Sequence, residues 1–349
     1  MLGDGLFARE ALLSRMRQAA FADGSAATMA LATGGPTLAY AAEPDTSPAS
    51  PIDSVLANAG GDAVALKTAA VSANTYWTQA VGAWGRRGSD GNAADVRPTL
   101  AGSFSGVDRR FGPDWLGGVA GGYTASSVGI TARASSANIE TAHLAGYAAG
   151  NYGSWYLRAA GSVSFSPLAT SRTITFPGFS DTAIGRYGAT MAQVFGEASY
   201  GVALGRIAAE PFAGLAFVQL RTDGFTEASG SGTAALTASA ASDGIGYSTL
   251  GARVATSYVQ PNGMILMPRI SAAWQHALGP VTPTAALSFQ STGAPFTIAG
   301  LPLARDTALL ESGLTLQINP QARLGLSYSS GLGPHVQHNS VQGSQIWRF

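Results

Sequence analysis

The chain has 349 residues, of which only 11% are charged, and its 20 basic residues balance its 20 acidic ones. This balance argues against a nucleic-acid-binding protein, and the absence of cysteine excludes disulfides, thiolate nucleophiles and cysteine metal sites. The sequence contains no run of about 18 uncharged apolar residues, so it predicts no membrane-spanning helix. A positive mean hydropathy of 0.14 without such a run favours a sheet with apolar side chains at every second position.

Residues 6–22 form the one stretch with helical periodicity. Leu6, Leu12, Leu13 and Met16 recur at the spacing of an apolar helix face. The rest of this predicted helix is basic and carries Arg9, Arg15 and Arg17. No secretory signal precedes the helix, although 16–42 can also be interpreted as a weak signal peptide ending in Ala39-Tyr40-Ala41.

Residues 23–74 are rich in Ala, Gly, Pro, Ser and Thr, and three prolines lie between positions 44 and 51. This composition predicts a linker, with a short helical turn in 61–72. We therefore divide the chain into a helical segment 1–22, a linker 23–74 and a β-domain 75–349.

From residue 75 onward the hydrophobic pattern has period two. Trp155, Leu157 and Val163, for example, alternate with Arg158, Ser162 and Ser164. The same alternation predicts strands at 75–87, 97–109, 115–126, 136–150, 153–166, 188–203, 206–221, 245–260, 263–277, 307–319, 322–331 and 337–349.

The lengths of the connections distinguish a membrane barrel from a soluble sandwich. Connections after even-numbered strands are short, whereas those after odd-numbered strands are mostly long, at 88–96, 127–135, 167–187, 222–244 and 278–306. An outer-membrane barrel has an even number of strands of this length, with short turns on one side and long loops on the other. The sequence therefore predicts an all-β fold: a 12-stranded antiparallel transmembrane barrel with the N-terminal helix in or near its lumen.

Charged side chains fall on the predicted inner face of the wall. They are Arg158, Glu197, Glu210, Arg253, Arg269, Glu311, Arg323 and Arg348. Two interpretations remain open: these residues grip the basic helix 6–22, or they pair with one another across neighbouring strands.

The last strand ends on an aromatic residue. Val341, Trp347 and Phe349 share its predicted outer face, and Gln342 lies on the inner face. Aromatic side chains are expected at the interfaces of a membrane barrel. We assign this position to Trp77, Trp115, Tyr123, Trp155, Tyr200, Tyr258, Trp274, Tyr328 and Trp347.

Several segments together resemble the C-terminal translocator domain of bacterial autotransporters, the type V secretion system. They are GVDRRFGPDWLGGVAGGY (106–123), FGEASYGVAL with EPFAGLAFV (195–218), GYSTLGARVA (246–255), PRISAAWQHALG (268–279), the run from 287 to 328, and the final WRF. REALLSRMRQAA (9–20) is similar to the helix that precedes such barrels.

The resemblance implies an outer-membrane barrel that exports an N-terminal passenger, with lipid and the barrel assembly machinery as partners and a monomeric state. It also implies that Gln342, Trp347 and Phe349 belong to the signal read by that machinery, although Gly343 stands one place early. Passenger and signal peptide are both missing from the pattern, so we interpret the chain either as the C-terminal piece of a longer product or as a degenerate reading frame. The passenger's identity does not follow from the sequence.

No residue cluster predicts an enzyme, a metal or a cofactor. His335 and His338 lie three apart without nearby carboxylates, and Ser248 does not fit a nucleophile elbow. Two rival functions are weighed against export. One is a passive pore, and the other is a hydrolase with its site on the outer loops, for which the loops supply Asp181, Asp223 and Asp243 but no adjacent histidine.

Overall fold

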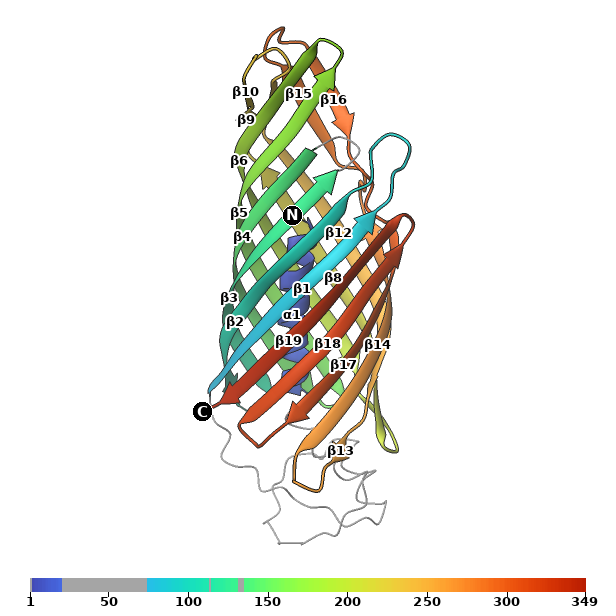
Figure 1. The fold of residues 1–349 in the computed structure, drawn as a ribbon. Coiled ribbons are helices and arrows are strands. Elements are labelled where there is room, and N and C mark those ends of the chain that lie inside the picture. Colours follow the sequence, from blue (N-terminus) through green and yellow to red (C-terminus); the bar gives the residue numbers. More distant parts are fainter. Residues whose placement is uncertain (1, 21–73, 113, 131–134) are drawn as a thin grey trace, which may run out of the picture.

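The computed structural model describes residues 2–20, 74–112, 114–130 and 135–349. An antiparallel sheet closes around a single helix, α1 (Leu2–Ala20), which runs along the inside of the barrel (Figure 1). The predicted linker 23–74 lies outside the described residues except for Asn74, as do the last two residues of the predicted helix. No helix in the described part of the chain is both long and apolar enough to cross a bilayer.

The wall is 12-stranded over the described residues. Its first half comprises β1 (Asn74–Arg87), β2 (Arg97–Phe111), β3 (Trp115–Ile130), β4 (Ser135–Tyr152), β5 (Trp155–Phe176) and β6 (Phe179–Tyr200). Its second half comprises β8 (Ile207–Thr222), β12 (Ala241–Ala255), β14 (Ile265–Leu278), β17 (Asp306–Gln317), β18 (Ala322–Gly333) and β19 (Val336–Arg348). All twelve coincide with predicted strands, which confirms the predicted fold class.

The first and last strands complete the ring. β1 pairs with β19 from Thr75 opposite Arg348 to Arg87 opposite Val336. On the far side β6 pairs directly with β8, so no wall strand is left with a free edge. Asn74 and Phe349 lie at the same end of the barrel (Figure 1), which we call the inner end. The opposite end, with the long connections, is the outer end.

The predicted loop at 167–187 is wrong. β5 and β6 continue through this region and are joined at Pro177-Gly178, where Gly178 has a positive φ of 85°. The sequence here is rich in Thr and Ser and lacks the apolar alternation of the wall. The two strands therefore project as a hairpin beyond the outer end (Figure 1), where one face no longer needs to be apolar.

The other two longest connections also contain strands that the sequence did not predict. β9 (Phe225–Thr226), β10 (Ala228–Ser229) and β11 (Leu236–Ala238) lie between β8 and β12. β15 (Thr284–Phe289) and β16 (Pro295–Ala299) lie between β14 and β17. Together β9, β11, β15 and β16 make a second, four-stranded sheet at the outer end. Two short strands, β7 (Val202–Leu204) and β13 (Tyr258–Val259), border inner turns.

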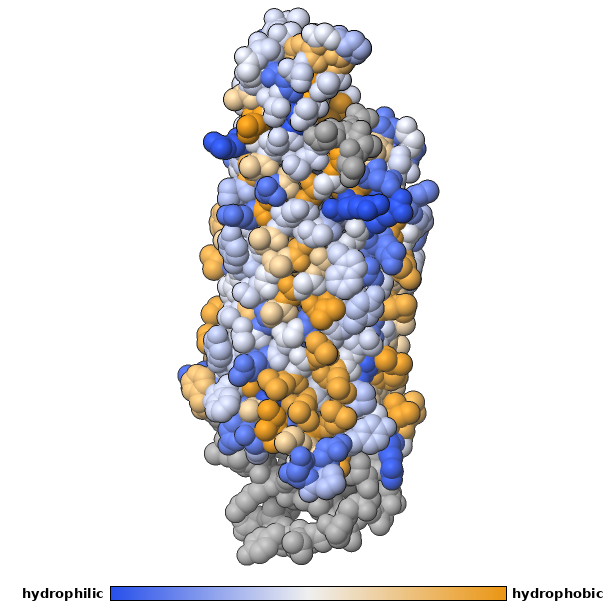
Figure 2. Space-filling view, in the orientation of Figure 1, coloured by the Kyte–Doolittle hydropathy of each residue, from blue (hydrophilic) through white to orange (hydrophobic). Residues whose placement is uncertain are grey.

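The two faces of the wall differ as the alternation predicts. Side chains such as Leu314, Leu326 and Val194 are exposed on the outside, and Figure 2 shows apolar residues spread over the barrel surface. Inward-facing neighbours such as Thr315 are buried. The interface assignment is wrong for Trp77, which is only 2% exposed because odd-numbered residues of β1 point into the lumen.

Candidate functional site

The lumen holds α1 against the first half of the wall. Phe7, Leu12 and Met16 of the helix pack with inward-facing Trp77 and Phe104 in the main apolar core. The helix lies against β1 to β6, and its buried small residues at 8, 11 and 19 allow close approach to the wall. Burying a large apolar side chain stabilises a fold by about 1.5–3 kcal/mol, so this contact alone favours an occupied lumen.

Arg15 and Asp108 join α1 to β2 near the inner end. The Arg15 guanidinium donates from Nε and Nη2 to the two carboxylate oxygens of Asp108, each at 2.7 Å. Both side chains are almost completely buried. The Tyr147 hydroxyl donates a further bond of 2.8 Å to Asp108 and accepts one of 2.6 Å from Trp77 Nε1. We call these four residues the Asp108 site.

Gly118 on β3 makes room for this arrangement. A Cβ placed on Gly118 would lie 2.6 Å from the Tyr147 hydroxyl and 2.7 Å from the Asp108 Cβ. Such distances are far below van der Waals contact, so only glycine lets Tyr147 reach across β3 to Asp108. The glycine-rich stretch of β3 thus serves the site as well as the strand.

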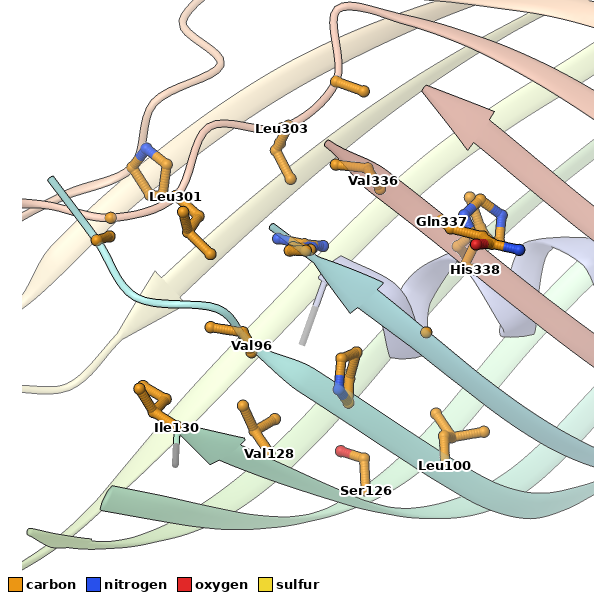
Figure 3. Close-up of a pocket in the computed structure, with 18 of the residues that line it drawn as sticks. Val96, Leu100, Ser126, Val128, Ile130, Leu301, Leu303, Val336, Gln337 and His338 are labelled. Carbon is orange, nitrogen blue, oxygen red and sulfur yellow. The ribbon is translucent and has the colours of Figure 1, made fainter. Parts of the chain in front are cut away.

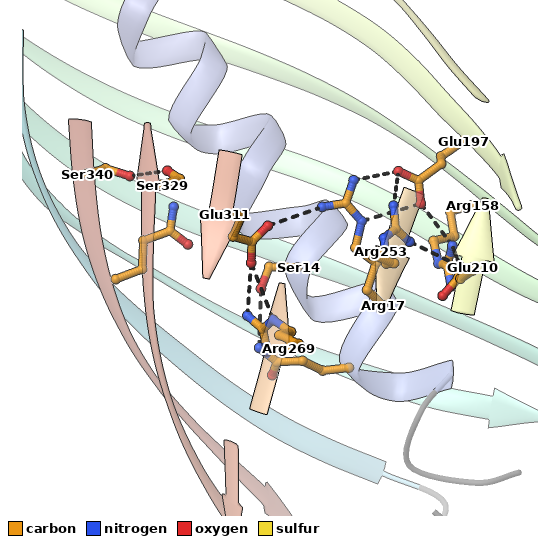
Figure 4. Close-up of polar contacts among 12 residues, drawn as sticks. Ser14, Arg17, Arg158, Glu197, Glu210, Arg253, Arg269, Glu311, Ser329 and Ser340 are labelled. Atoms are coloured by element: carbon orange, nitrogen blue, oxygen red, sulfur yellow. Dashed lines mark hydrogen bonds and ion pairs between the residues drawn. The ribbon is translucent and has the colours of Figure 1, made fainter. Parts of the chain in front are cut away.

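Arg17 joins α1 to β6 on the other side of the lumen. Its guanidinium donates two bonds to Glu197, and its Nη1 lies 4.0 Å from the Glu311 carboxylate (Figure 4). Glu197 also pairs with Arg158 at 2.8 Å and with Arg253 at 2.8 Å. Glu210 pairs with the same two arginines, at 2.9 Å and 3.0 Å. We call Arg17, Arg158, Glu197, Glu210 and Arg253 the Glu197 site.

The remaining predicted inner charges lie around these two sites. Arg269 donates to Glu311 at 3.1 Å and to Thr315 at 3.2 Å. Arg323 donates to Gln317 at 3.1 Å, and Arg348 is half-buried at the end of β19. Arg9 on α1 is buried with its guanidinium 5.2 Å from the centre of the Tyr247 ring, a cation–π contact. Glu197 and Glu311 therefore contact both Arg17 of the helix and arginines of neighbouring strands, so the two interpretations of the inner charges are not exclusive.

Comparison with known proteins gives the family. The model of the autotransporter beta-domain matches residues 76–329, which is most of the chain. The chain belongs to this family. It is accordingly a translocator barrel of the bacterial outer membrane.

Curated relatives and solved structures agree with this membership. Two proteins named extracellular serine protease from Serratia marcescens are 32% and 31% identical over 276 residues, which is 79% of this chain. The chain spans about a quarter (26%) of the length of these relatives. The translocator domain of autotransporter NalP from Neisseria meningitidis superposes with a TM-score of 0.63 at 15% identity, over 79% of this chain and 88% of that one. The beta domain of the Bordetella autotransporter BrkA gives 0.57 at 19% identity, over 79% and 100%.

The final strand of this autotransporter barrel, β19, has one buried polar face and one exposed aromatic face near its end. Gln342 is buried and hydrogen-bonds the side chain of Gln79 on β1. Trp347 and Phe349 are both exposed, and the Phe349 amide donates to the carbonyl oxygen of Asn74 at the inner end.

Sequence reasoning missed the Asp108 site. Asp108 stands in the strand with Phe104 and Leu100, all even-numbered and all buried, so the parity that placed Arg158 and Glu197 inward also places Asp108 there. Tyr147 and Trp77 follow the same rule on β4 and β1. The alternation does not give the depth of each residue along the barrel axis. This depth decides which wall residues contact Arg15.

The described lumen residues form ion pairs and apolar contacts, and they do not form a metal site. Among the described residues no group of three His, Asp, Glu or Cys side chains is placed to hold a metal ion. His335 occupies the turn before β19 with a positive φ of 56°, and His338 points inward from β19. The arrangement is suited to holding a polypeptide helix inside a wall.

Proposed function

We propose that this barrel anchors and exports a passenger joined to the N-terminus of α1, and that the charged lumen residues hold α1 in place afterwards. The observation that carries the proposal is the pair of contacts Arg15–Asp108 and Arg17–Glu197, which fix a helix along the lumen axis. The inner wall is complementary in charge to the helix, as expected for a permanent occupant.

The direction of α1 supports the same proposal. Leu6 and Phe7 lie beside Leu301 and Leu303 of the outer connections, whereas Arg15 lies beside Asp108, close to the inner turn after Phe111. The helix thus runs from the outer end to the inner end. Any polypeptide that precedes α1 would leave the barrel on the outer side, while β1 begins at the inner end.

The proposal assigns three parts to the chain: a lumen helix in 1–22, a linker in 23–74 and the membrane domain 75–349. The protease activity named for the Serratia relatives would belong to such a passenger, because the chain spans only 26% of their length. We propose that the barrel itself carries no enzymatic activity.

A passive pore is the main rival and is tested by conductance. A barrel filled by α1 should pass little current in planar bilayers, and deletion of residues 1–20 should open large, steady channels. Equal conductance of the full chain and the deleted chain would contradict the proposal.

A passenger domain fused before Met1 should reach protease-accessible positions on the cell surface only with the full barrel present.

We propose further that lipid contacts the outer face and that the assembly machinery reads the end of β19. Phe349 is 63% exposed, so its deletion removes little packing from the folded wall. We expect deletion to lower insertion in cells far more than refolding into detergent, with Phe289→Ala, an exposed change on β15, as the matched control. Equal losses in both assays would show that Phe349 is merely structural.

A further inference from the structure

Two arginines lie side by side on the outside of the wall, at its outer end. Arg86 is close to the end of β1, Arg97 is the first residue of β2, and both are exposed. Arg87 and Val96 exchange two backbone hydrogen bonds of 2.9 Å, and this bridge sets their neighbours Arg86 and Arg97 opposite each other. Such a pair, next to a hydrogen-bonded one, is the closer kind of antiparallel pair, with Cα atoms about 4.5 Å apart. The two guanidiniums are therefore within reach of one ligand.

The alternation of the two strands turns both side chains away from the lumen. Val96 and Leu100 line the outer part of the lumen (Figure 3), so the odd-numbered Arg97 faces the other way. On β1 the even-numbered Trp84, which is 48% exposed, shares the outer face with Arg86. Figure 2 shows a cluster of strongly hydrophilic residues over the outer ends of these two strands. The arginine pair therefore faces the surroundings of the barrel and not its interior.

The pair lies at the level of lipid headgroups. Tyr76 and Trp84 are exposed aromatic residues of β1, about 26 Å apart along the strand and about 20 Å apart along the barrel axis at a tilt of about 40°. The apolar band of an outer-membrane barrel is about 25 Å tall and is flanked by aromatic residues at both interfaces. Trp84 therefore marks the outer interface, and Arg86 lies just beyond it.

The pair carries more positive charge than its neighbours neutralise. Arg86 pairs with Asp95 at 2.6 Å, whereas the Arg97 side chain forms no hydrogen bond or ion pair with the described residues. The Arg86 hydrogen bond and, more weakly, the charge of Arg97 lower the pKa of Asp95, so both guanidiniums act on one carboxylate. Like charges directly opposite each other destabilise a sheet. An anion between the two guanidiniums would remove this repulsion.

We propose that Arg86 and Arg97 bind the phosphate group of a lipid in the outer leaflet, with its acyl chains beside Trp84. Arginine guanidiniums donate charge-assisted hydrogen bonds to phosphate oxygens and match their geometry. Gly82 lies below Trp84 on the same face, and a Cβ placed on it would meet no atom within 4 Å, so the surface there is open to acyl chains. The site depends on the outer-membrane location of the barrel and does not depend on export of a passenger.

A free phosphate ion fits the pair less well than a lipid does. Arg86 is shared with Asp95, and both arginines are exposed, so water and salt weaken their attraction for a dissolved ion. The acyl chains of a lipid hold its headgroup at the level of the pair, which raises the effective concentration of the phosphate there. The pair is therefore suited to an anion that the membrane itself presents.

The experiment is a binding titration of the refolded full chain in detergent micelles, followed by native mass spectrometry. The probes are lipid A with two phosphates and the same lipid after removal of both phosphates. Acyl chains of either lipid associate with the whole lipid-facing wall, so the difference between the two lipids reports on the headgroup. We expect the phosphorylated lipid to bind at least about tenfold more tightly, as charge-assisted hydrogen bonds predict.

Arg97→Gln tests the arginine that has no partner. This variant should bind the phosphorylated lipid about tenfold more weakly and bind the dephosphorylated lipid as the wild type does. Arg109→Gln is the matched control, because Arg109 is exposed on the same face of β2 but lies at the inner end, opposite Asn74. The two variants change the net charge equally. Heat-modifiable migration on gels checks that each variant is folded.

Asp95→Asn tests the pair in the opposite direction. Loss of the carboxylate frees the Arg86 guanidinium, so this variant should bind the phosphorylated lipid several-fold more tightly than the wild type does. If the Arg86–Asp95 pair only shaped the loop, its loss would leave binding equal or weaker. Asp114→Asn is the charge-matched control, because Asp114 lies in the inner turn between β2 and β3.

Three results would overturn the proposal. Equal binding of the two lipids would mean that the wall takes up acyl chains without recognising a headgroup. Equal weakening by Arg97→Gln and Arg109→Gln would mean that net charge, and not the pair, attracts the lipid. Inorganic phosphate that displaces the phosphorylated lipid at an equal concentration would assign the pair to a dissolved anion.

Discussion

Asp108 and Glu197 hold the same helix, but they differ in what remains when the helix leaves. Among the described residues Arg15 is the only ion-pair partner of Asp108, which otherwise accepts a bond from the Tyr147 hydroxyl. Glu197 forms ion pairs with Arg17 of the helix and with the two wall arginines Arg158 and Arg253. Without α1, Asp108 would lose its ion pair and keep only the longer-range attraction of Arg348 at the end of β19, whereas Glu197 would stay paired within the wall.

This difference assigns distinct roles to the two sites. A buried charge left without its partner is strongly unfavourable, so the Asp108 site favours an occupied lumen. The Glu197 site stabilises the wall whether or not the helix is present, because its pairs span β5, β6, β8 and β12. A barrel that admits a chain and then retains a helix benefits from both arrangements.

The largest effect is expected for Arg15→Met. Removing one partner of a buried ion pair typically costs about 3–5 kcal/mol, which shifts the balance between helix-filled and open barrels by more than about two orders of magnitude. The open probability of single channels in planar bilayers measures this shift directly. An unchanged open probability would mean that apolar packing alone retains α1.

The double variant Arg15→Met/Asp108→Asn sharpens that result. Asn at position 108 is neutral, so the double variant has no unpaired carboxylate in the wall. It should therefore open less often than Arg15→Met alone, although both variants lack the ion pair. If the double variant opens as often as the single one, the unpaired carboxylate is not what drives opening.

The contrast between the two sites also marks where sequence reasoning stops. Alternation along the strands places Arg158, Glu197, Glu210 and Arg253 on the inner face, and burial agrees for all four. It places Asp108 inward just as well. It does not tell which charges share a level, because that depends on the tilt and stagger of the wall strands. The helix was expected in or near the lumen, but its rotation, which turns Arg15 toward β2 and Arg17 toward β6, follows from packing against Trp77 and Phe104.

The outer end was harder to predict than the wall. Once β5 and β6 pass beyond the membrane, their outer faces need not be apolar, so the alternation that identifies wall strands fades after Leu168. The short strands of the second sheet, such as β11 and β16, are too brief to show any period at all. Long-range pairing decides them, and the pairing is not visible in any one segment.

A smaller effect is expected for Arg17→Met. Glu197 keeps Arg158 and Arg253 in this variant, so only the hydrogen bonds of one partly exposed arginine are lost. Such bonds are worth about 1.5–3 kcal/mol, and the open probability should rise by roughly 10- to 100-fold, less than for Arg15→Met. The same bilayer recording compares it with Arg15→Met. The assignment of roles fails if Arg17→Met opens the channel as strongly as Arg15→Met does.

The smallest effect is expected for Asp95→Asn in the outer loop 88–96, a solvated pair that contrasts with both lumen sites. Arg86 and Asp95 are joined at 2.6 Å, but their side chains are 62% and 37% exposed, so water and salt screen the attraction.

The Arg86 guanidinium and the Ser89 amide hold the pKa of Asp95 below its ordinary value of 3.8. A carboxylate with a lowered pKa stabilises the fold above its unfolded pKa, and this contribution is lost as the pH falls through the lower, folded pKa. The melting temperature of Asp95→Asn should therefore lie just below that of the wild type at pH 6 and low salt, and the two should converge below pH 3.8 or in high salt. A gap that persists in acid would mean that the carboxylate's charge is not what Asp95 contributes, and a change in open probability would tie this loop to the helix.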